Sequence, residues 1–272
     1  MKISILTPSY NQGEYLEQNI LSVLNQNYDD FEHIIIDGGS TDDTISVLKK
    51  YPHLKWVSEK DEGQADALNK GLRIASGDYV GWLNSDDYYE PNIFQTVVKY
   101  FENFDADWVI GNSTYYQQYN GSYFVNKSPV ITYKDLLRDP DIVRQPPAFF
   151  KKAFLEKLQG FNKSFHMVMD YDLWIRAARI SEPYMADDNF AFFRIHEGQK
   201  SSLDNFSIQQ EEISAILLRE GYPKLKIITY VVKKRFLQMN KRVRSYLREV
   251  IPEVLWYHGK KYKSTLNKII KQ

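Results

Sequence analysis

The chain has no cysteine among its 272 residues. This absence excludes a disulfide framework, a thiolate zinc site and a cysteine nucleophile. The chain also lacks any apolar run near the roughly 20 residues that a bilayer-spanning helix needs. Its first apolar stretch is too short for the core of a signal peptide. We therefore expect a soluble or peripheral protein of the cytoplasm, at most bound to the inner face of the cell membrane.

An overall excess of charge is absent too, since 35 basic residues balance 35 acidic ones. The distribution is uneven, because residues 224–272 hold 14 Lys and Arg but only two acidic residues. We predict a catalytic domain over residues 1–205 and a basic amphipathic helical extension over residues 206–272. The extension has two interpretations: it packs on the catalytic domain, or it contacts an anionic membrane. Nucleic acid is not expected as a partner, because the rest of the chain is acidic.

Short apolar runs alternate with helical patterns in the first half of the chain. This alternation is typical of an α/β fold with a mainly parallel sheet. Ser40 is expected to cap a helix over residues 41–50. The aromatic stretch 113–147 favours β-hairpins. Strands are predicted at Ile3–Thr7, His33–Asp37, Lys55–Ser58, Tyr79–Leu83 and Trp108–Gly111, and the second of them is expected to be buried.

Polar motifs follow the apolar strands or lie at the starts of helices. Each motif alone also fits a turn, a helix cap or a solvated loop. Asp86 and Asp87 are adjacent carboxylates that repel each other, so a bound cation favours the pair. Oxygen ligands of this kind suit Mg²⁺ or Mn²⁺. The sequence does not support a phosphate-binding glycine loop, because neither GxGxxG nor GxxxxGK[ST] occurs.

Together, the motifs resemble those of the family 2 glycosyltransferases, which are inverting enzymes of the GT-A fold. The resemblance covers about residues 2–202 and implies a nucleotide-sugar half over residues 1–112 and an acceptor half over residues 113–205. It rests, in this order, on TPSYNQ, IIIDGGSTDDT, DEGQADALNKG, GDYVGWLNSDD, MDYDLWIR and FRIHEGQKSS.

The resemblance also implies residue roles by position. Asp170 matches the catalytic base, and Asp87 and His196 match metal contacts. Two positions depart from the family pattern: Asn84 stands where Asp is common, and Met169 stands where Glu is common. The residues that match nucleotide-sugar contacts are Thr7, Pro8, Ser9, Tyr10, Asp37, Asp61, Asp66 and Asp86. Asp172 and His166 are the alternatives for the base.

The implied activity is transfer of a sugar, with inversion, from a nucleoside-diphosphate sugar to an acceptor hydroxyl. A UDP-sugar donor, a glycan or lipid-linked acceptor, Mn²⁺ or Mg²⁺ as cofactor and a role in cell-surface polysaccharide synthesis are expected. One alternative is a catalytically silent sugar-nucleotide binder. A sugar-phosphate nucleotidyltransferase is the other, but TPSYNQGEY lacks the glycine-rich basic loop that this class uses.

Overall fold

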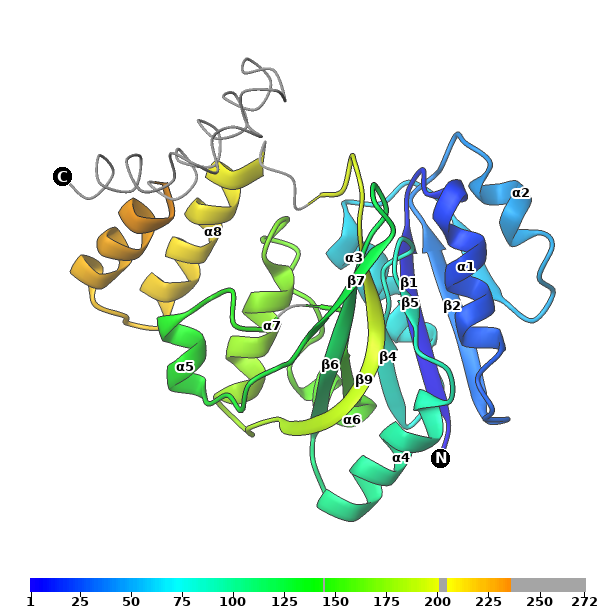
Figure 1. Cartoon of the computed structure of the whole chain (residues 1–272), viewed down its shortest axis with the longest axis horizontal. Coiled ribbons are helices and arrows are strands. Elements are labelled where there is room, and N and C mark those ends of the chain that lie inside the picture. Colours follow the sequence, from blue (N-terminus) through cyan, green and yellow to red (C-terminus); the bar gives the residue numbers. More distant parts are fainter. Residues whose placement is uncertain (144, 201–204, 236–272) are drawn as a thin grey trace, which may run out of the picture. The chain divides into compact units, whose positions relative to one another are not determined.

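The computed structural model describes residues 1–143, 145–200 and 205–235 (Figure 1). The chain divides into two compact units, residues 1–216 and 217–272. The first unit therefore ends several residues beyond the expected boundary at 205. The predicted extension is described only up to residue 235, so most of its apolar stripe lies outside the described residues.

Within the described residues, nine strands form one sheet in the order β3-β2-β1-β4-β8-β6-β9-β5, and β7 pairs with β6. Strands β1 to β4 are parallel, whereas β8 runs antiparallel to both β4 and β6. The α/β architecture expected from the first half of the sequence is therefore present. The bounds are β1 (Ile3–Ser9), β2 (Phe31–Asp37), β3 (Lys55–Ser58), β4 (Tyr79–Trp82), β5 (Tyr88–Tyr89), β6 (Trp108–Gln117), β7 (Ser122–Asn126), β8 (Ala148–Lys151) and β9 (Tyr184–Ile195).

Helices flank the sheet of the first unit (Figure 1). Helices α1, α2 and α4 pack on one face, and α3, α6 and α7 pack on the other. Their bounds, with those of the two other named helices, are α1 (Gly13–Leu24), α2 (Thr44–Leu48), α3 (Gln64–Ile74), α4 (Ile93–Phe104), α5 (Tyr133–Arg138), α6 (Lys152–Lys157), α7 (Met169–Ala178) and α8 (Phe206–Arg219).

Strands β1, β2 and β4 are almost wholly buried, as strands covered on both faces are, whereas β3 and β7 are largely exposed. Ile35 packs in a cluster with α1 and α2. Its neighbours Ile34 and Ile36 point the other way, where Gly71 of α3 approaches them closely. Alternate side chains of one strand thus hold helices on opposite faces.

The strand register brings the polar motifs together at one edge of the sheet. Ser9 at the end of β1 is aligned with Asp37 at the end of β2, and Asp37 is aligned with Ser58 of β3. Strand β4 ends beside β1, with Trp82 aligned with Leu6. The carboxyl ends of adjacent parallel strands are where open α/β sheets bind ligands.

The predicted cap at Ser40 is wrong. Helix α2 starts only at Thr44, and Asp43 occupies its N-cap position. The hydroxyl of Ser40 instead donates to Asp37 and accepts a hydrogen bond of 2.7 Å from the backbone of Asn11. The polar turn between β2 and α2 therefore uses Ser40 to join two loops.

The expected hairpin in the aromatic stretch is present as β6 and β7. The same stretch contains α5, which the sequence pattern does not predict. A capping box between Thr132 and Asp135 begins this helix.

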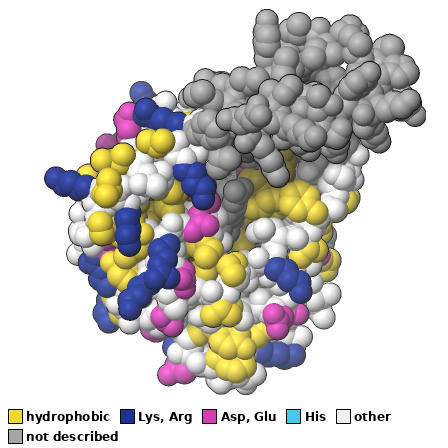
Figure 2. All heavy atoms as spheres, turned by 60° about the vertical axis from the view of Figure 1, so that its left-hand side comes forward, with side chains coloured by type: hydrophobic (Ala, Val, Ile, Leu, Met, Phe, Trp, Pro, Cys, Tyr) yellow, Lys and Arg dark blue, Asp and Glu magenta, His cyan; other side chains and the backbone are white. Residues whose placement is uncertain are grey.

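Charged and hydrophobic side chains are interspersed on the surface shown in Figure 2. Among the residues that the structure describes, no helix combines the length and the hydrophobicity that a membrane span requires.

Candidate active site

The turn Asn84-Ser85-Asp86-Asp87 follows β4, and a side chain of α1 binds it. The buried amide of Asn19 donates to the carbonyls of Asn84, at 2.8 Å, and Asp87, at 3.0 Å. Two carbonyls of the turn are thus fixed by one side chain. No motif points to Asn19, whose only distinction in the sequence is its place on a helix after β1.

Asp86 and His196 meet across this turn. Nε2 of His196 lies 3.1 Å from Oδ2 of Asp86. The side chain of His196 is 4% exposed and that of Asp86 is 22% exposed. The other ring nitrogen, Nδ1, lies 2.7 Å from the carbonyl of Glu197, which can only accept a hydrogen bond. Nδ1 therefore carries a proton, and a neutral ring would point a lone pair of Nε2 at the carboxylate.

That arrangement requires a positive charge between Nε2 and the carboxylate. A proton on Nε2 is one source of this charge, and the hydrogen bond to Asp86 raises the pKa of His196. A divalent cation is the alternative, because it also binds a carboxylate and a neutral imidazole.

Asp87 is only 2% exposed, and its carboxylate is engaged within the protein. Its Oδ1 accepts from the backbone of Arg194 at 3.0 Å, and its Oδ2 accepts from Asn84 at 3.3 Å. Burial, reinforced by the charge of Asp86, raises the pKa of Asp87. Of the two adjacent carboxylates, Asp86 is the more accessible to a ligand.

Arg194 joins the turn to α1 and β9, and the sequence interpretation missed it. Its Nε donates to the carbonyl of Asp86 at 2.9 Å, and its Nη2 donates to Gln18. The guanidinium lies over the rings of Tyr15, Tyr88 and Tyr116 at 5.1, 5.4 and 5.5 Å from their centroids. The only signal for it in the sequence is its position two residues before His196.

Asp37, at the end of β2, is fully buried. Its Oδ2 accepts from the backbone of Ser40 at 2.9 Å and from the hydroxyl of Ser58 at 2.6 Å. The carboxylate thus shapes the turn. The next residue, Gly38, has no room for a side chain, because a Cβ there would lie 2.9 Å from Oδ2 of Asp61. The loops that carry Asp37 and Asp61 are therefore packed against each other.

The end of β1 presents buried and exposed groups side by side. Thr7 is 1% exposed, and its hydroxyl lies 2.9 Å from Nε2 of His33. Pro8 and Ser9 are buried, whereas Tyr10 is 61% exposed. Of these four predicted contacts, Tyr10 alone offers an exposed side chain.

Asp66 lies in the first turn of α3, where it pairs with two lysines. Lys163 approaches to 3.3 Å and Lys70 to 3.6 Å. A role of Asp66 with a nucleotide therefore competes with these two ion pairs.

Asp170 lies in the first turn of α7 and is partly exposed. Desolvation by the surrounding protein raises the pKa of Asp170 to about 6. The backbone hydrogen bond from Tyr171 and the nearby charge of Lys200 partly oppose this rise. A carboxyl group with this pKa is ionised at neutral pH and is more basic than an ordinary aspartate. It is chemically suited to remove a proton from a hydroxyl group.

The two alternatives for the base lie in different surroundings. Asp172 is fully buried and pairs with Arg176 at 2.7 Å, while Arg176 also donates to the carbonyl of Gly160 at 2.9 Å. Asp172 therefore has a structural role. His166 is exposed and lies beside Gly63, in the loop that follows Asp61.

Gln64 connects the strand-end turn to the vicinity of Asp170. Its amide donates to Oδ1 of Asn84 at 2.7 Å and accepts from the ammonium of Lys200 at 3.0 Å. Lys200 in turn interacts electrostatically with Asp170. The Asp86–His196 pair and Asp170 thus belong to one continuous polar region. The sequence interpretation does not single out Gln64, although it lies in DEGQAD.

Within the described ranges, no group of three His, Cys, Asp or Glu side chains gathers as a metal-binding cluster. The Asp86–His196 pair is nevertheless compatible with a divalent cation. Adjacent ligands of an octahedral ion at about 2.1 Å lie roughly 3.0 Å apart, close to the observed 3.1 Å. Cations of this kind complete their coordination with water and substrate phosphates.

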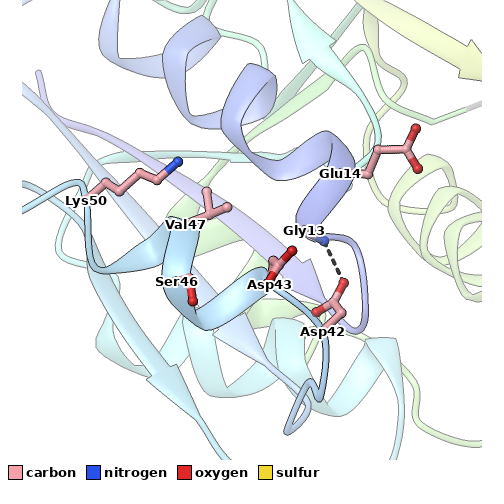
Figure 3. Close-up of a pocket in the computed structure, with 7 residues that line it drawn as sticks. All are labelled: Gly13, Glu14, Asp42, Asp43, Ser46, Val47 and Lys50. Atoms are coloured by element: carbon pink, nitrogen blue, oxygen red, sulfur yellow. Dashed lines mark hydrogen bonds between the residues drawn. The ribbon is translucent and has the colours of Figure 1, made fainter.

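A pocket between the start of α1 and α2 contains none of the predicted site residues (Figure 3). The backbone of Gly13 donates to Asp42 at 2.9 Å on its wall. The acidic groups there are thus partly used to join the two helices.

Comparison with known proteins gives the same classification as the motifs. The model of the family described as "Glycosyl transferase family 2" matches residues 4–172. Chondroitin synthase from Escherichia coli is 27% identical over 234 residues, or 82% of this chain. The chain spans only 34% of the length of that relative.

Solved structures share the fold at low sequence identity. S. aureus TarS in complex with UDP-GlcNAc is 19% identical, with a TM-score of 0.66 over 93% of this chain and 77% of that one. The mannosyltransferase PcManGT from Pyrobaculum calidifontis, in complex with GDP-Man and Mn²⁺, is 18% identical, with a TM-score of 0.59 over 96% of this chain and 80% of that one. The chain belongs to glycosyltransferase family 2 and has the GT-A fold.

Proposed function

We propose that the protein transfers a sugar from a nucleoside-diphosphate sugar to an acceptor hydroxyl, with inversion at the anomeric carbon. The observation that carries the proposal is the combination of the Asp86–His196 pair with Asp170 in one polar region at the strand ends. Family membership supports a nucleotide-sugar donor. A catalytically silent binder would have no need for a carboxylate whose pKa is raised toward neutrality.

In this proposal, Asp86 and His196 would hold Mn²⁺ or Mg²⁺. The bound ion would supply Lewis-acid stabilisation of the departing nucleoside diphosphate. Asp87 and Arg194 would hold Asp86 in place, since both are bonded within the same turn. The sequence interpretation assigned the direct metal contact to Asp87, and the buried position of Asp87 favours Asp86 instead.

Asp170 would act as the general base. Its ionised carboxylate accepts the proton of the acceptor hydroxyl while that oxygen attacks the anomeric carbon from the face opposite the leaving group. One displacement of this kind inverts the anomeric configuration. The leaving group is already stabilised as a diphosphate, so a general acid of the glycosidase type is not required.

The donor would lie across the ends of β1, β2 and β4. Tyr10 and the packed loops of Asp37 and Asp61 border this edge of the sheet. A UDP-sugar is the favoured donor, and the TarS complex with UDP-GlcNAc supports it, whereas the PcManGT complex with GDP-Man gives the principal alternative. The acceptor is proposed to be a glycan or a lipid-linked glycan of the cell surface, because the E. coli relative is named chondroitin synthase.

The basic extension is proposed to contact the cytoplasmic face of the membrane. Leu225, Ile228 and Val232 are 75%, 58% and 61% exposed, and lysines flank them. Co-flotation with anionic vesicles tests this contact. Equal binding of the wild-type chain and a Leu225→Ser, Ile228→Ser variant would contradict this part of the proposal.

Thermal stabilisation by a panel of sugar nucleotides, with and without Mn²⁺, tests the proposed function. One donor should raise Tm in the presence of Mn²⁺, because a ligand at 100 times its Kd adds about 2.7 kcal/mol to the stability of the fold. Asp86→Ala should abolish the metal-dependent part of the shift. The absence of a shift with every donor would contradict the proposal.

A further inference from the structure

Glu212 of α8 holds the segment that leads into the helix of Asp170. Its Oε1 accepts from the backbone of His166 at 2.8 Å, and its Oε2 accepts from the backbones of Met167, at 2.8 Å, and Val168, at 3.1 Å. A single carboxylate thus binds three consecutive N–H groups just before α7. The donors belong to Val168, the N-cap residue of α7, and to the two residues that precede it.

The contact of Glu212 includes the N-cap residue of α7. Val168 occupies the N-cap position of α7, but its side chain offers no oxygen for a capping hydrogen bond. Glu212 therefore accepts from the N–H of the N-cap residue, as the carboxylate of a capping box does, but from another helix. Its negative charge also lies at the positive end of the α7 dipole.

Glu212 and Asp170 share an electrostatic neighbour, Lys200, which follows the strand that brings His196 to Asp86. Helix α8 follows that strand in the chain, and Asn205, just before α8, donates to the carbonyl of Lys200 at 2.9 Å. The ammonium of Lys200 interacts electrostatically with both Asp170 and Glu212. The part of the chain that completes the His196 side of the site thus also fixes the Asp170 side.

We propose that Glu212 is a positioning residue for the transfer reaction, which sets the position of Asp170 by fixing the backbone of residues 166–168. This inference rests on the proposed function of Asp170 as the base. Glu212 does not touch the substrate in this scheme. It acts on Asp170 through the start of α7, because Asp170 lies two residues after Val168, whose backbone Glu212 binds.

The position at which the family often has Glu is Met169, which is buried here. A carboxylate is nevertheless present at this helix start, supplied from α8. Glu212 therefore adds a carboxylate contact directly before Met169, beside the carboxylates of Asp170 and Asp172 in the first turn of α7.

Glu212→Ala and Glu212→Gln test the inference, with Glu211→Gln as the matched control. Glu211 is the exposed neighbour on the same helix. Glu212→Ala should lower kcat about 10- to 100-fold, because a misplacement of about 1 Å at a reacting group can cost 100-fold. The donor Kd should stay unchanged. Glu212→Gln keeps one acceptor oxygen and should lose less activity, and Glu211→Gln should lose none.

A role in stability alone would give a different result. All assays are run well below the Tm of each variant and are normalised to folded protein. Variants with a lower Tm but a wild-type kcat per folded molecule would overturn the inference, as would a rise in donor Kd that accounts for the whole loss of activity.

Titration of the Asp170 carboxyl by NMR gives a readout that needs no substrate. Release of the backbone in Glu212→Ala should let Asp170 reach solvent, so its midpoint should fall from about 6 toward the ordinary aspartate range. An unchanged midpoint in this variant would overturn the inference. A shifted midpoint in a protein that turns over no sugar nucleotide would instead contradict the proposed function and leave the positioning role of Glu212 supported.

Discussion

Nε2 of His196 lies 3.1 Å from Oδ2 of Asp86, although 110 positions separate these two residues in the chain. Strand β9 places the histidine beside the turn after β4, and Tyr15 packs on its ring with centroids 4.5 Å apart. The hydrogen bond of Nδ1 to the carbonyl of Glu197 leaves Nε2 to face the carboxylate. This pairing is the basis for the proposed cation site.

Replacement of His196 by Ala should remove most of the stabilisation that Mn²⁺ gives in the presence of the donor, because it removes one of the two proposed protein ligands. His53→Ala is the control, since His53 is exposed and lies outside the site. Calorimetric titration of Mn²⁺ in the presence of a UDP-sugar measures the effect. Equal Mn²⁺ affinity in both variants would exclude His196 as a ligand.

The rate of transfer should increase with pH through about 6. The proposed base Asp170 would cause this dependence, since only its ionised form accepts a proton and burial raises its pKa to about 6. A profile of kcat between pH 5 and 8, with Mn²⁺ saturating at every pH, measures this dependence. A rate that is constant across this range would show that the ionisation of Asp170 does not limit the reaction.

Asp170→Asn should be more stable than the wild type at pH 8. Because the pKa of Asp170 is raised from 3.8 to about 6 in the folded chain, its contribution to stability is greatest below pH 3.8 and is lost as the pH rises through about 6. A shift of this size corresponds to up to about 3 kcal/mol. Urea unfolding at pH 8 measures the difference, and a less stable variant would contradict the cause assigned to the shift.

Asp172→Ala should destabilise the fold by about 3 kcal/mol, because it leaves the Arg176 partner of a buried ion pair uncompensated. The pair lies at 2.7 Å with Asp172 fully buried. Glu156→Ala is the matched control, since it removes another i,i+4 pair that lies largely exposed at the surface. Similar urea midpoints for the two variants would argue against a structural role for Asp172.

The fold of the parallel half could be predicted from its sequence, because continuous apolar runs with polar residues at their ends are typical of buried parallel strands. Strand β3 was predicted at Lys55–Ser58 and lies there. The exact start of α2 could not be predicted, since Ser40 had two partners available and the tertiary contact to Asp37 and Asn11 prevailed over a local cap.

The site was only partly predictable, because sequence motifs identify residues but not their exposure. Asp86 and Asp87 are indistinguishable as neighbours in a motif, and only the packing of Arg194 against the turn separates an accessible carboxylate from a buried one. Glu212 has no motif at all. Its role depends on three backbone contacts between helices that are distant in the chain.

The configuration of the product is the most direct test of the account. NMR of the reaction with an α-linked sugar nucleotide, Mn²⁺ and an acceptor panel should show a β-linked product. The Asp170→Asn variant should form it about 10²–10⁴-fold more slowly, while the exposed control Asp43→Asn should match the wild type. An α-linked product, or an Asp170→Asn variant as active as the wild type, would contradict single displacement with Asp170 as the base.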